Sequence, residues 1–246
     1  MRGLGGMTVL VTGASGGIGR AIVARLVEEG ARVCAAARDE ARLDALAGVT
    51  PLRLDVTREE DWRAAVARLG ADGHGLDGLV NNAGDRASGR VEETTDALWH
   101  AMIETNLTSV FRGCRACLPL LRERGGGAIV NVGSITGIRG TEAMVAYSAS
   151  KSGITAMTAS LALDHAGDGI RVNAVCPAAT DTRMVREMLD GAPDRPAAER
   201  ALVAKHPMGR AARVEEVAGT VAFLLSADAG FITGQSIAVD GGRSMR

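Results

Sequence analysis

Short runs of apolar and β-branched residues alternate with longer amphipathic stretches along the whole chain. The short runs predict buried strands, and the longer stretches, with apolar positions every three or four residues, predict helices. We expect strands at 7–12, 31–36, 50–54, 76–81, 127–132, 170–175 and 235–239. We expect helices at about 17–29, 40–47, 58–69, 95–123, 143–166 and 213–226. This alternation is typical of βαβ units, so the predicted fold class is α/β: a doubly wound, seven-stranded parallel sheet with helices on both faces.

One stretch of the chain, 183–212, departs from this alternation. Two short helical pieces there are interrupted by Gly191, Pro193, Pro196 and Pro207. Long insertions after a sheet strand often cover a binding site. The 246 residues fit one domain of this class. We therefore predict a single domain, 1–246, with 183–212 as a substrate lid.

Composition and charge exclude several classes of protein. Apolar residues make up 46% of the chain, enough for a large core, and the formal net charge is −1 with acids and bases interspersed. We therefore expect no nucleic-acid partner and no membrane partner. The start of the chain lacks a signal-peptide pattern, which predicts a cytoplasmic protein. The histidines and cysteines lack ligand spacing, so no metal is predicted, and the cysteines are expected to be small buried or interfacial residues.

A glycine-rich turn follows the first predicted strand and opens the first helix. Gly13, Gly17 and Gly19 let the backbone approach a phosphate closely, and Ser15 and Ile18 lie between them at the helix start. A helix N-terminus offers N–H groups and a positive dipole end to an anion. An ordinary strand-to-helix turn is the alternative in a chain with 32 glycines.

Two more strand ends are predicted to face the same crevice. Asp55 and Val56 follow the third strand, where the carboxylate can bond an adenine edge or cap the next helix. Asn82, Ala83 and Gly84 follow the fourth strand, where small residues suit a chain that leaves the sheet beside a ligand. In such sheets ligands bind beyond the carboxyl ends of the strands.

The end of the second strand bears on the choice of cofactor. An acid there usually holds a free ribose 2′-hydroxyl, whereas an arginine suits a 2′-phosphate. The chain has Ala37 followed by Arg38, which favours NADP(H). Asp39 keeps NAD(H) possible, although we expect it to cap the next helix.

The single tyrosine, Tyr147, is followed one helical turn later by Lys151. Positions four apart lie on one face of a helix. A phenol is a weak acid near neutral pH, and an ammonium about 4 Å away favours the phenolate by roughly 4 kcal/mol at an effective dielectric near 20. The pair is therefore a candidate for general acid–base catalysis, with lysine lowering the pKa of tyrosine.

Taken together, these motifs resemble those of the short-chain dehydrogenase/reductase family, in the branch of about 250 residues that includes 3-oxoacyl carrier-protein reductases. The resemblance covers essentially the whole chain and rests on the following residues: Thr12 to Gly19, Asp55, Asn81 to Gly84, Asn106, Ser134, Tyr147, Lys151, Asn173 to Pro177, Thr233 to Gln235 and Val239 to Gly242. It implies a Rossmann fold. It also implies a homotetramer built through the long helices.

The resemblance implies four catalytic residues. Ser134 would bond the substrate oxygen, Tyr147 would exchange a proton with it, and Lys151 would lower the pKa of tyrosine and bind the nicotinamide ribose. Asn106 would order a water relay through the lysine. The expected cofactor-binding residues are Gly13, Ser15, Gly17, Ile18, Gly19, Arg38, Asp55, Val56, Asn82, Ala83, Gly84, Tyr147, Lys151, Pro177, Thr180 and Thr182. The chain departs from the family at Ala178, usually glycine, and at Asp85, usually apolar.

The leading hypothesis is an oxidoreductase that transfers hydride between NADPH and a carbonyl or secondary alcohol, with a 3-oxoacyl thioester or polyketide-type ketone as favoured substrate. A sugar, polyol or small-alcohol dehydrogenase using NAD is the alternative. Sugar-nucleotide epimerases normally need a longer chain. A catalytically silent dinucleotide sensor or scaffold is the reading from a different class, and the set Asn106, Ser134, Tyr147 and Lys151 argues against it.

Overall fold

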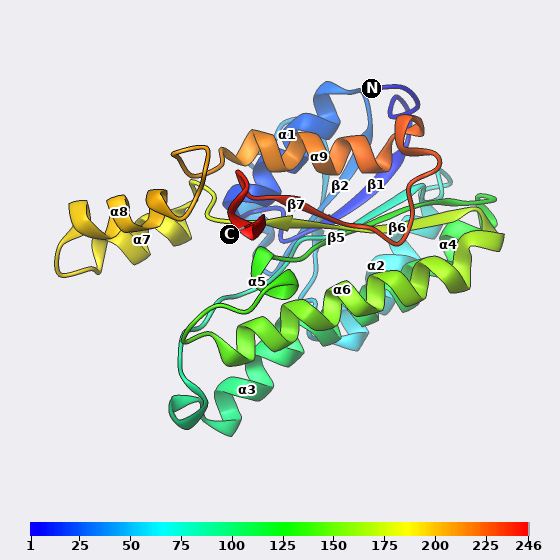
Figure 1. Ribbon diagram of the computed structural model, residues 1–246. Coiled ribbons are helices and arrows are strands. Elements are labelled where there is room, and N and C mark those ends of the chain that lie inside the picture. Colours follow the sequence, from blue (N-terminus) through cyan, green and yellow to red (C-terminus); the bar gives the residue numbers. More distant parts are fainter. Residues whose placement is uncertain (246) are drawn as a thin grey trace.

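The computed structural model describes residues 1–245, and its strands form one parallel sheet (Figure 1). The strands are β1 (Thr8–Thr12), β2 (Arg32–Ala37), β3 (Val49–Arg53), β4 (Gly78–Asn81), β5 (Gly127–Val132), β6 (Ile170–Pro177) and β7 (Ser236–Val239). They lie in the order β3-β2-β1-β4-β5-β6-β7. This confirms the predicted fold class. The order reverses between β1 and β4, which is where doubly wound sheets bind ligands.

Helices cover both faces of the sheet (Figure 1). On one face lie α1 (Gly17–Glu28) and α9 (Val214–Leu225), and on the other lie α2 (Glu59–Ala71), α4 (Ser109–Glu123) and α6 (Val145–His165). Two apolar clusters fill the layers between helices and sheet. Every residue of β1 is buried, because a parallel strand in the middle of the sheet is covered on both faces.

Two predicted helices differ from the structure. Instead of a helix over 40–47, the chain forms one 3₁₀ turn, η1 (Glu40–Leu43). Asp39 stands at its N-cap but its side chain accepts no cap hydrogen bond, so the first N–H groups lack the side-chain partner that would favour an α-helix there.

The long helix predicted over 95–123 is divided into three parts. They are α3 (Asp96–Ile103), a π-helical turn η3 (Glu104–Thr108) and α4. A π turn widens the helix locally and is common at functional sites. Here it contains Asn106, which is fully buried and hydrogen-bonded to the loop after β4.

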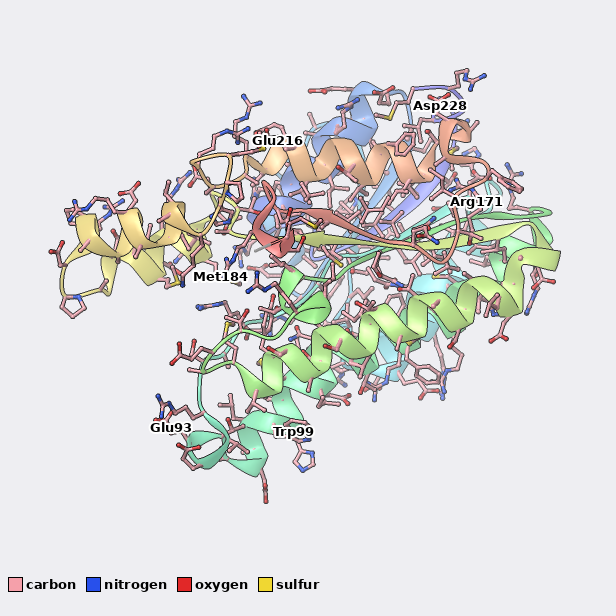
Figure 2. The ribbon with its side chains drawn as sticks, viewed as in Figure 1. Glu93, Trp99, Arg171, Met184, Glu216 and Asp228 are labelled. Atoms are coloured by element: carbon pink, nitrogen blue, oxygen red, sulfur yellow. The ribbon has the colours of Figure 1, made fainter. Side chains whose placement is uncertain are left out.

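The segment after β6 contains the two short helices that the sequence indicated. They are α7 (Arg183–Asp190) and α8 (Arg195–Ala204), and together we call them the α7–α8 arm. The arm extends away from the sheet in Figure 1. Met184, on α7, is 45% exposed and lies on the side of the arm toward α5 (Ile135–Ile138) in Figure 2.

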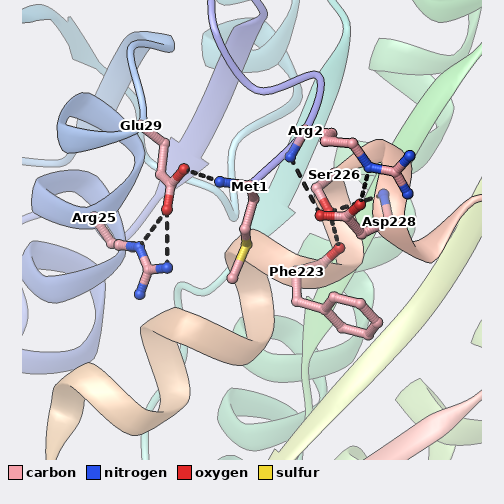
Figure 3. Close-up of polar contacts among 7 residues, drawn as sticks. All are labelled: Met1, Arg2, Arg25, Glu29, Phe223, Ser226 and Asp228. Carbon is pink, nitrogen blue, oxygen red and sulfur yellow. Dashed lines mark hydrogen bonds and ion pairs between the residues drawn. The ribbon is translucent and has the colours of Figure 1, made fainter.

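Ion pairs and hydrogen bonds fasten the N-terminal residues to the layer of α1 and α9 (Figure 3). The terminal amine pairs with Glu29, which also pairs with Arg25. Arg2 pairs with Asp228 in η5 (Ala227–Ala229), just after α9. These contacts lie far from the carboxyl ends of the strands, so they support the fold rather than the site.

The four cysteines are buried and free, as the sequence predicted. Burial raises the pKa of Cys114 to about 12, which keeps this thiol protonated. Within residues 1–245, no helix has both the length and the apolar character needed to span a membrane.

Candidate active site

The structure gathers most of the predicted site residues at the carboxyl edge of the sheet. The segments that meet there are Gly13–Gly19 after β1, Asn82–Gly84 after β4, Ser134 after β5, Pro177 and the residues following it at the end of β6, and the first two turns of α6 with Tyr147 and Lys151. The switch between β1 and β4 places the glycine loop beside the loop after β4. Arg38, Asp55 and Val56 lie just beyond the ends of the outer strands β2 and β3.

The glycine loop packs directly on the loop that follows β4. Gly13 has φ +63°, and a Cβ on it would lie 2.8 Å from the Cα of Ala83. A Cβ on Gly19 would overlap the carbonyl oxygen of Gly13. The side chain of Asn82 donates to the carbonyl oxygens of Thr12 (3.0 Å) and Gly13 (3.1 Å). Glycine is therefore required at both positions by close contact.

The start of α1 fits a bound phosphate. Its N-cap, Gly16, makes no side-chain cap hydrogen bond, and the first turn contains no acidic residue. The first N–H groups and the positive end of the helix dipole are thus left for an anion. The Nε of Arg20 donates to the carbonyl oxygen of Ser15 at 3.1 Å, and Ile18 packs against the apolar core. These two contacts hold the loop against the rest of the protein.

Asp55 lies at the expected strand end but does not cap a helix. Its carboxylate accepts hydrogen bonds from the N–H (3.0 Å) and hydroxyl (2.7 Å) of Thr57, while Arg58 occupies the N-cap of α2. Burial favours a raised pKa for Asp55, but the bonds from Thr57 and the charge of Arg38 outweigh it and the pKa is lowered. Asp55 is therefore a carboxylate. At the next residue, the indole N–H of Trp62 donates to the carbonyl oxygen of Val56 at 3.0 Å.

Arg38 and Asp39 are both exposed at the end of β2. The expectation that Asp39 caps the next helix is wrong, because its side chain makes no such bond. The charge of Arg38 acts on the carboxylate of Asp55, but among residues 1–245 no ion pair holds its guanidinium. Both side chains are thus available to a ligand that reaches this strand end.

Lys151 is a buried ammonium without an acidic partner in residues 1–245. It is 5% exposed, and its Nζ donates to the carbonyl oxygen of Val132 at 2.9 Å. A Cβ on Gly84 would lie 3.4 Å from this Nζ. Burial lowers the pKa of Lys151 to about 8. The residue is therefore mostly charged at neutral pH and loses its proton within the working range of an enzyme.

Tyr147 differs from the expectation that Lys151 would lower its pKa. Burial raises the pKa of Tyr147, and a hydrogen bond with Ser134 and the charge of Arg86 oppose the rise. The lysine Nζ lies 5.9 Å from the centre of the tyrosine ring and is itself desolvated and directed at Val132. The phenol is consequently protonated at neutral pH, the form needed by a proton donor.

Asn106 connects the π turn with two other parts of the site. Its amide accepts from the N–H of Asp85 (2.8 Å) and donates to the carbonyl oxygen of Asp85 (3.0 Å). It also donates to Ser150 on α6 at 3.1 Å. A Cβ on Gly84 would lie 2.9 Å from its Oδ1. Asn106 therefore holds the loop after β4 next to Lys151.

Ser134 begins the short helix α5. Its hydroxyl oxygen accepts from the N–H of Thr136 at 3.2 Å and from the hydroxyl of Thr136 at 2.7 Å. The side chain is 8% exposed and that of Thr136 is 6% exposed. The hydroxyl of Ser134 is thus a fixed, buried group at the end of β5.

The residues after β6 connect the sheet to the α7–α8 arm. The N–H of Ala178 donates to Val239 at 3.2 Å, so alanine continues the pairing with β7 here. The hydroxyl of Thr180 turns back to the carbonyl oxygen of Ala178 at 3.2 Å. Thr182 caps α7, and a Cβ on Gly17 would lie 3.1 Å from its methyl. The arm therefore starts against the glycine loop.

A surface cavity of about 700 Å³ lies next to the start of α6. It is lined by the loop 89–92, the segment 138–145 and the first turns of α6, with Thr136 at its inner side. The two loops are bridged where the N–H of Gly89 donates to Ala143 at 2.7 Å. Ala143 has φ +52°, an unfavourable value for a residue with a Cβ. The bridge thus holds a strained turn just before Tyr147.

Sequence reasoning missed Thr136, Arg86 and Thr57. Thr136 and Thr57 bond the side chains two residues before them, Ser134 and Asp55, whereas Arg86 acts through its charge on Tyr147. Thr57 had a usable signal, because Asp-x-Thr is a common turn pattern. Ser-x-Thr at 134–136 is a turn pattern of the same kind, whereas for Arg86 the sequence carries no signal that we recognise.

Comparisons with known proteins agree with this geometry. A family model described as enoyl-(acyl carrier protein) reductase matches residues 13–244. The chain is 38% identical to 2-(S)-hydroxypropyl-CoM dehydrogenase 3 of Xanthobacter autotrophicus, covering 95% of each chain. It is 40% identical to acetoacetyl-CoA reductase of Rhizobium meliloti, covering 95% of this chain and 97% of that one.

A solved structure gives the same result. The ligand-free aldohexose dehydrogenase of Thermoplasma acidophilum superposes with a TM-score of 0.92 at 35% identity, covering 99% of this chain and 96% of that one. Proteins of this family bind NAD(P). The chain belongs to the short-chain dehydrogenase/reductase family and is an oxidoreductase that acts on CH–OH groups.

Proposed function

We propose that this chain is a ketoreductase that reduces a 3-oxoacyl thioester, or a polyketide-type ketone, with NADPH. The observation that carries the proposal is the placement of Tyr147: it lies one turn before Lys151 on α6, the lysine Nζ is 5.9 Å from the centre of its ring, and its phenol interacts with Ser134. The similarity to an acetoacetyl-CoA reductase supports the substrate class, because acetoacetyl-CoA is itself a 3-oxoacyl thioester.

In this proposal Ser134 and Tyr147 hold the substrate carbonyl oxygen. When bound beside Tyr147 and Lys151, a reduced nicotinamide would supply the hydride that the carbonyl carbon receives. As the oxygen gains charge, Ser134 stabilises it through a hydrogen bond and Tyr147 gives it a proton. In the oxidative direction Tyr147 takes the proton back. Lys151 binds the ribose hydroxyls and, with a pKa of about 8, returns the proton to Tyr147 through waters ordered by Asn106.

The cofactor would lie along the carboxyl edge of the sheet. We assign its phosphates to the glycine loop with Gly13, Ser15, Gly17, Ile18 and Gly19. The remaining contacts are Arg38 at the 2′-phosphate, Asp55 and Val56 at the adenine, Asn82, Ala83 and Gly84 along the dinucleotide, Tyr147 and Lys151 at the nicotinamide ribose, and Pro177, Thr180 and Thr182 at the nicotinamide.

The exposed guanidinium of Arg38 supports NADPH over NADH. One observation favours a second candidate, a sugar or polyol dehydrogenase that uses NAD. Asp39 makes no cap bond, so its carboxylate is free to hold a ribose 2′-hydroxyl. The structural likeness to an aldohexose dehydrogenase points the same way.

We also propose that the α7–α8 arm closes over the substrate within a single domain, and that the chain works in the cytoplasm as a homotetramer. The outer sides of α4 and α6 support this assembly, because Phe111 is 47% and Leu163 is 83% exposed in the single chain. Such apolar side chains favour burial against another copy.

The test of the proposed function is turnover by the purified chain. Acetoacetyl-CoA is offered with NADPH and with NADH, and a panel of aldohexoses and polyols is offered with NAD and NADP. We expect fastest turnover with acetoacetyl-CoA and NADPH, followed as loss of absorbance of the reduced cofactor.

Tyr147→Phe is expected to lower kcat by roughly 10²–10⁴, the usual contribution of general acid catalysis, and to leave cofactor binding intact. Cofactor binding is measured by fluorescence titration of both proteins. Full activity of this variant would contradict the mechanism. Cofactor binding with no turnover of any substrate by the unaltered chain would favour a sensor or scaffold.

A further inference from the structure

The hydroxyl of Ser134 has its accepting capacity filled by one neighbour. A serine hydroxyl has one proton to donate and two lone pairs that accept. Thr136 supplies two donors, its N–H at 3.2 Å and its hydroxyl at 2.7 Å, and both end on the Oγ of Ser134. The proton of Ser134 is therefore the part of this hydroxyl that remains for the active site.

The direction of that proton follows from the surroundings. With the N–H and the hydroxyl of Thr136 both donating to its Oγ, the proton of Ser134 points away from Thr136, and Ser134 interacts with Tyr147 so as to lower the pKa of the phenol. Ser134 and Thr136 are 8% and 6% exposed, so bulk water does not compete for either hydroxyl. Thr136 is held on α5, where the N–H of Gly137 also bonds the carbonyl oxygen of Ser134 at 2.9 Å.

We propose that Thr136 is a positioning residue for the reaction: its hydroxyl and N–H fix Ser134 as a hydrogen-bond donor toward the oxygen that gains charge. The inference rests on the proposed role of Ser134. Donors that are already oriented stabilise a developing charge without reorganisation during the reaction. A serine rotor with a free lone pair can also accept a bond from the protonated phenol, and in that orientation its proton points away from the substrate oxygen.

The position of Thr136 offers a competing role that the experiment must separate. Thr136 also lies at the inner side of the 700 Å³ cavity next to α6, where a substrate can touch it. Direct contact with bound substrate would appear mainly in KM. Orientation of Ser134 acts as charge develops, so it appears in kcat.

The experiment compares Thr136→Val, which removes the hydroxyl at nearly constant shape, with Thr136→Ser, which keeps it. Both are also combined with Ser134→Ala in a double-mutant cycle. Steady-state kinetics are measured with NADPH and acetoacetyl-CoA, and thermal unfolding and NADPH binding verify that each variant is folded. Thr136→Ala replaces the valine variant if valine disturbs packing.

We expect Thr136→Val to lower kcat about tenfold with little change in KM, less than the roughly 100-fold or greater cost of losing an oxyanion donor. Thr136→Ser is expected to restore most of the activity. In the Ser134→Ala background, Thr136→Val is expected to have no further effect, because the group it orients is absent.

Three outcomes would overturn the inference: unchanged kcat in Thr136→Val, a change confined to KM, or an equal loss with and without Ser134. The Ser134→Ala variant distinguishes a failure of the proposed role of Ser134 from a failure of the role of Thr136. If it leaves kcat unchanged, the proposed role of Ser134 fails as well. If it lowers kcat while Thr136→Val does not, only the role of Thr136 fails.

Discussion

Lys151 in the crevice is 5% exposed and its ammonium bonds a carbonyl oxygen, whereas the side chain of Arg183 in the α7–α8 arm is 83% exposed and pairs with Glu187 one turn along. The ammonium of Lys151 is shielded from water and has no acidic partner in residues 1–245. The guanidinium of Arg183 remains hydrated and has an acidic partner on the same helix. Further exposed pairs in the arm region join Arg186 to Asp181 and Arg195 to Asp190.

The comparison distinguishes a buried charge, which we expect to act in the reaction, from exposed charges, which keep the arm hydrated. A buried ammonium costs folding free energy, and such a cost is usually found at functional sites. An exposed ion pair adds little to stability because water and salt screen it. Three variants test this contrast between the crevice and the arm.

The largest effect is expected from Lys151→Met. Activity should be lost almost completely, while the free energy of unfolding near pH 6 should increase by up to about 3 kcal/mol. The reason is that folding lowers the pKa of Lys151 from 10.5 to about 8, so the folded state bears the full cost of the buried charge below pH 8. The stability difference should close as pH rises from about 8 to 10.5.

Urea unfolding at pH 6 and pH 10 measures this effect. The matched control is Lys205→Met, since Lys205 is the chain's other lysine and is exposed. It should change neither activity nor stability appreciably. A Lys151→Met protein less stable than the unaltered chain at pH 6 would show that burial of the ammonium does not lower the stability of the folded chain.

A smaller effect is expected from Arg86→Gln. The charge of Arg86 lowers the pKa of Tyr147, so its loss should raise that pKa further. Oxidation of an alcohol needs the phenolate, and its pH–rate profile should therefore move to higher pH. Arg90→Gln is the control, because Arg90 lies on the same loop but faces Glu142 at 3.9 Å. If the pH–rate profiles of Arg86→Gln and the unaltered chain coincide, the charge of Arg86 does not affect the pKa of Tyr147.

The smallest effect is expected from Arg183→Ala in the arm. Removal of this exposed partner of Glu187 should change Tm by less than about 1 °C. KM for acetoacetyl-CoA and for the same acyl group on an acidic carrier protein should remain equal to those of the unaltered chain. A selective rise in KM for the carrier-bound substrate would instead show that the arm recognises the carrier.

The sequence predicted the sheet well because its strands are continuous apolar runs between amphipathic helices. All seven strands lie within a few residues of their predicted bounds, and β6 extends two residues further, through Pro177. The errors have local causes. The π turn around Asn106 and the 3₁₀ turn at 40–43 depend on which hydrogen bonds their polar side chains find, and periodicity does not contain that information.

The residues proposed for catalysis were also predictable as a set, but their electrostatics were not. Spacing placed Tyr147 and Lys151 on one face of a helix, which the structure has. It did not reveal that burial would dominate both groups, nor that Arg86 would be the cation that lowers the pKa of Tyr147. A pKa depends on the solvent and charges around a group, and these come from segments distant in sequence.

By itself, the sequence determined the seven strands of a doubly wound α/β fold, the glycine turn before α1 and the pairing of tyrosine with lysine, because each follows from local pattern and short spacing. Only the tertiary structure decided that Asn106 holds the loop after β4 and that Lys151 is buried without an acid beside it in residues 1–245. These are properties of the space between elements. That space exists only after the apolar faces of helices and sheet have packed together.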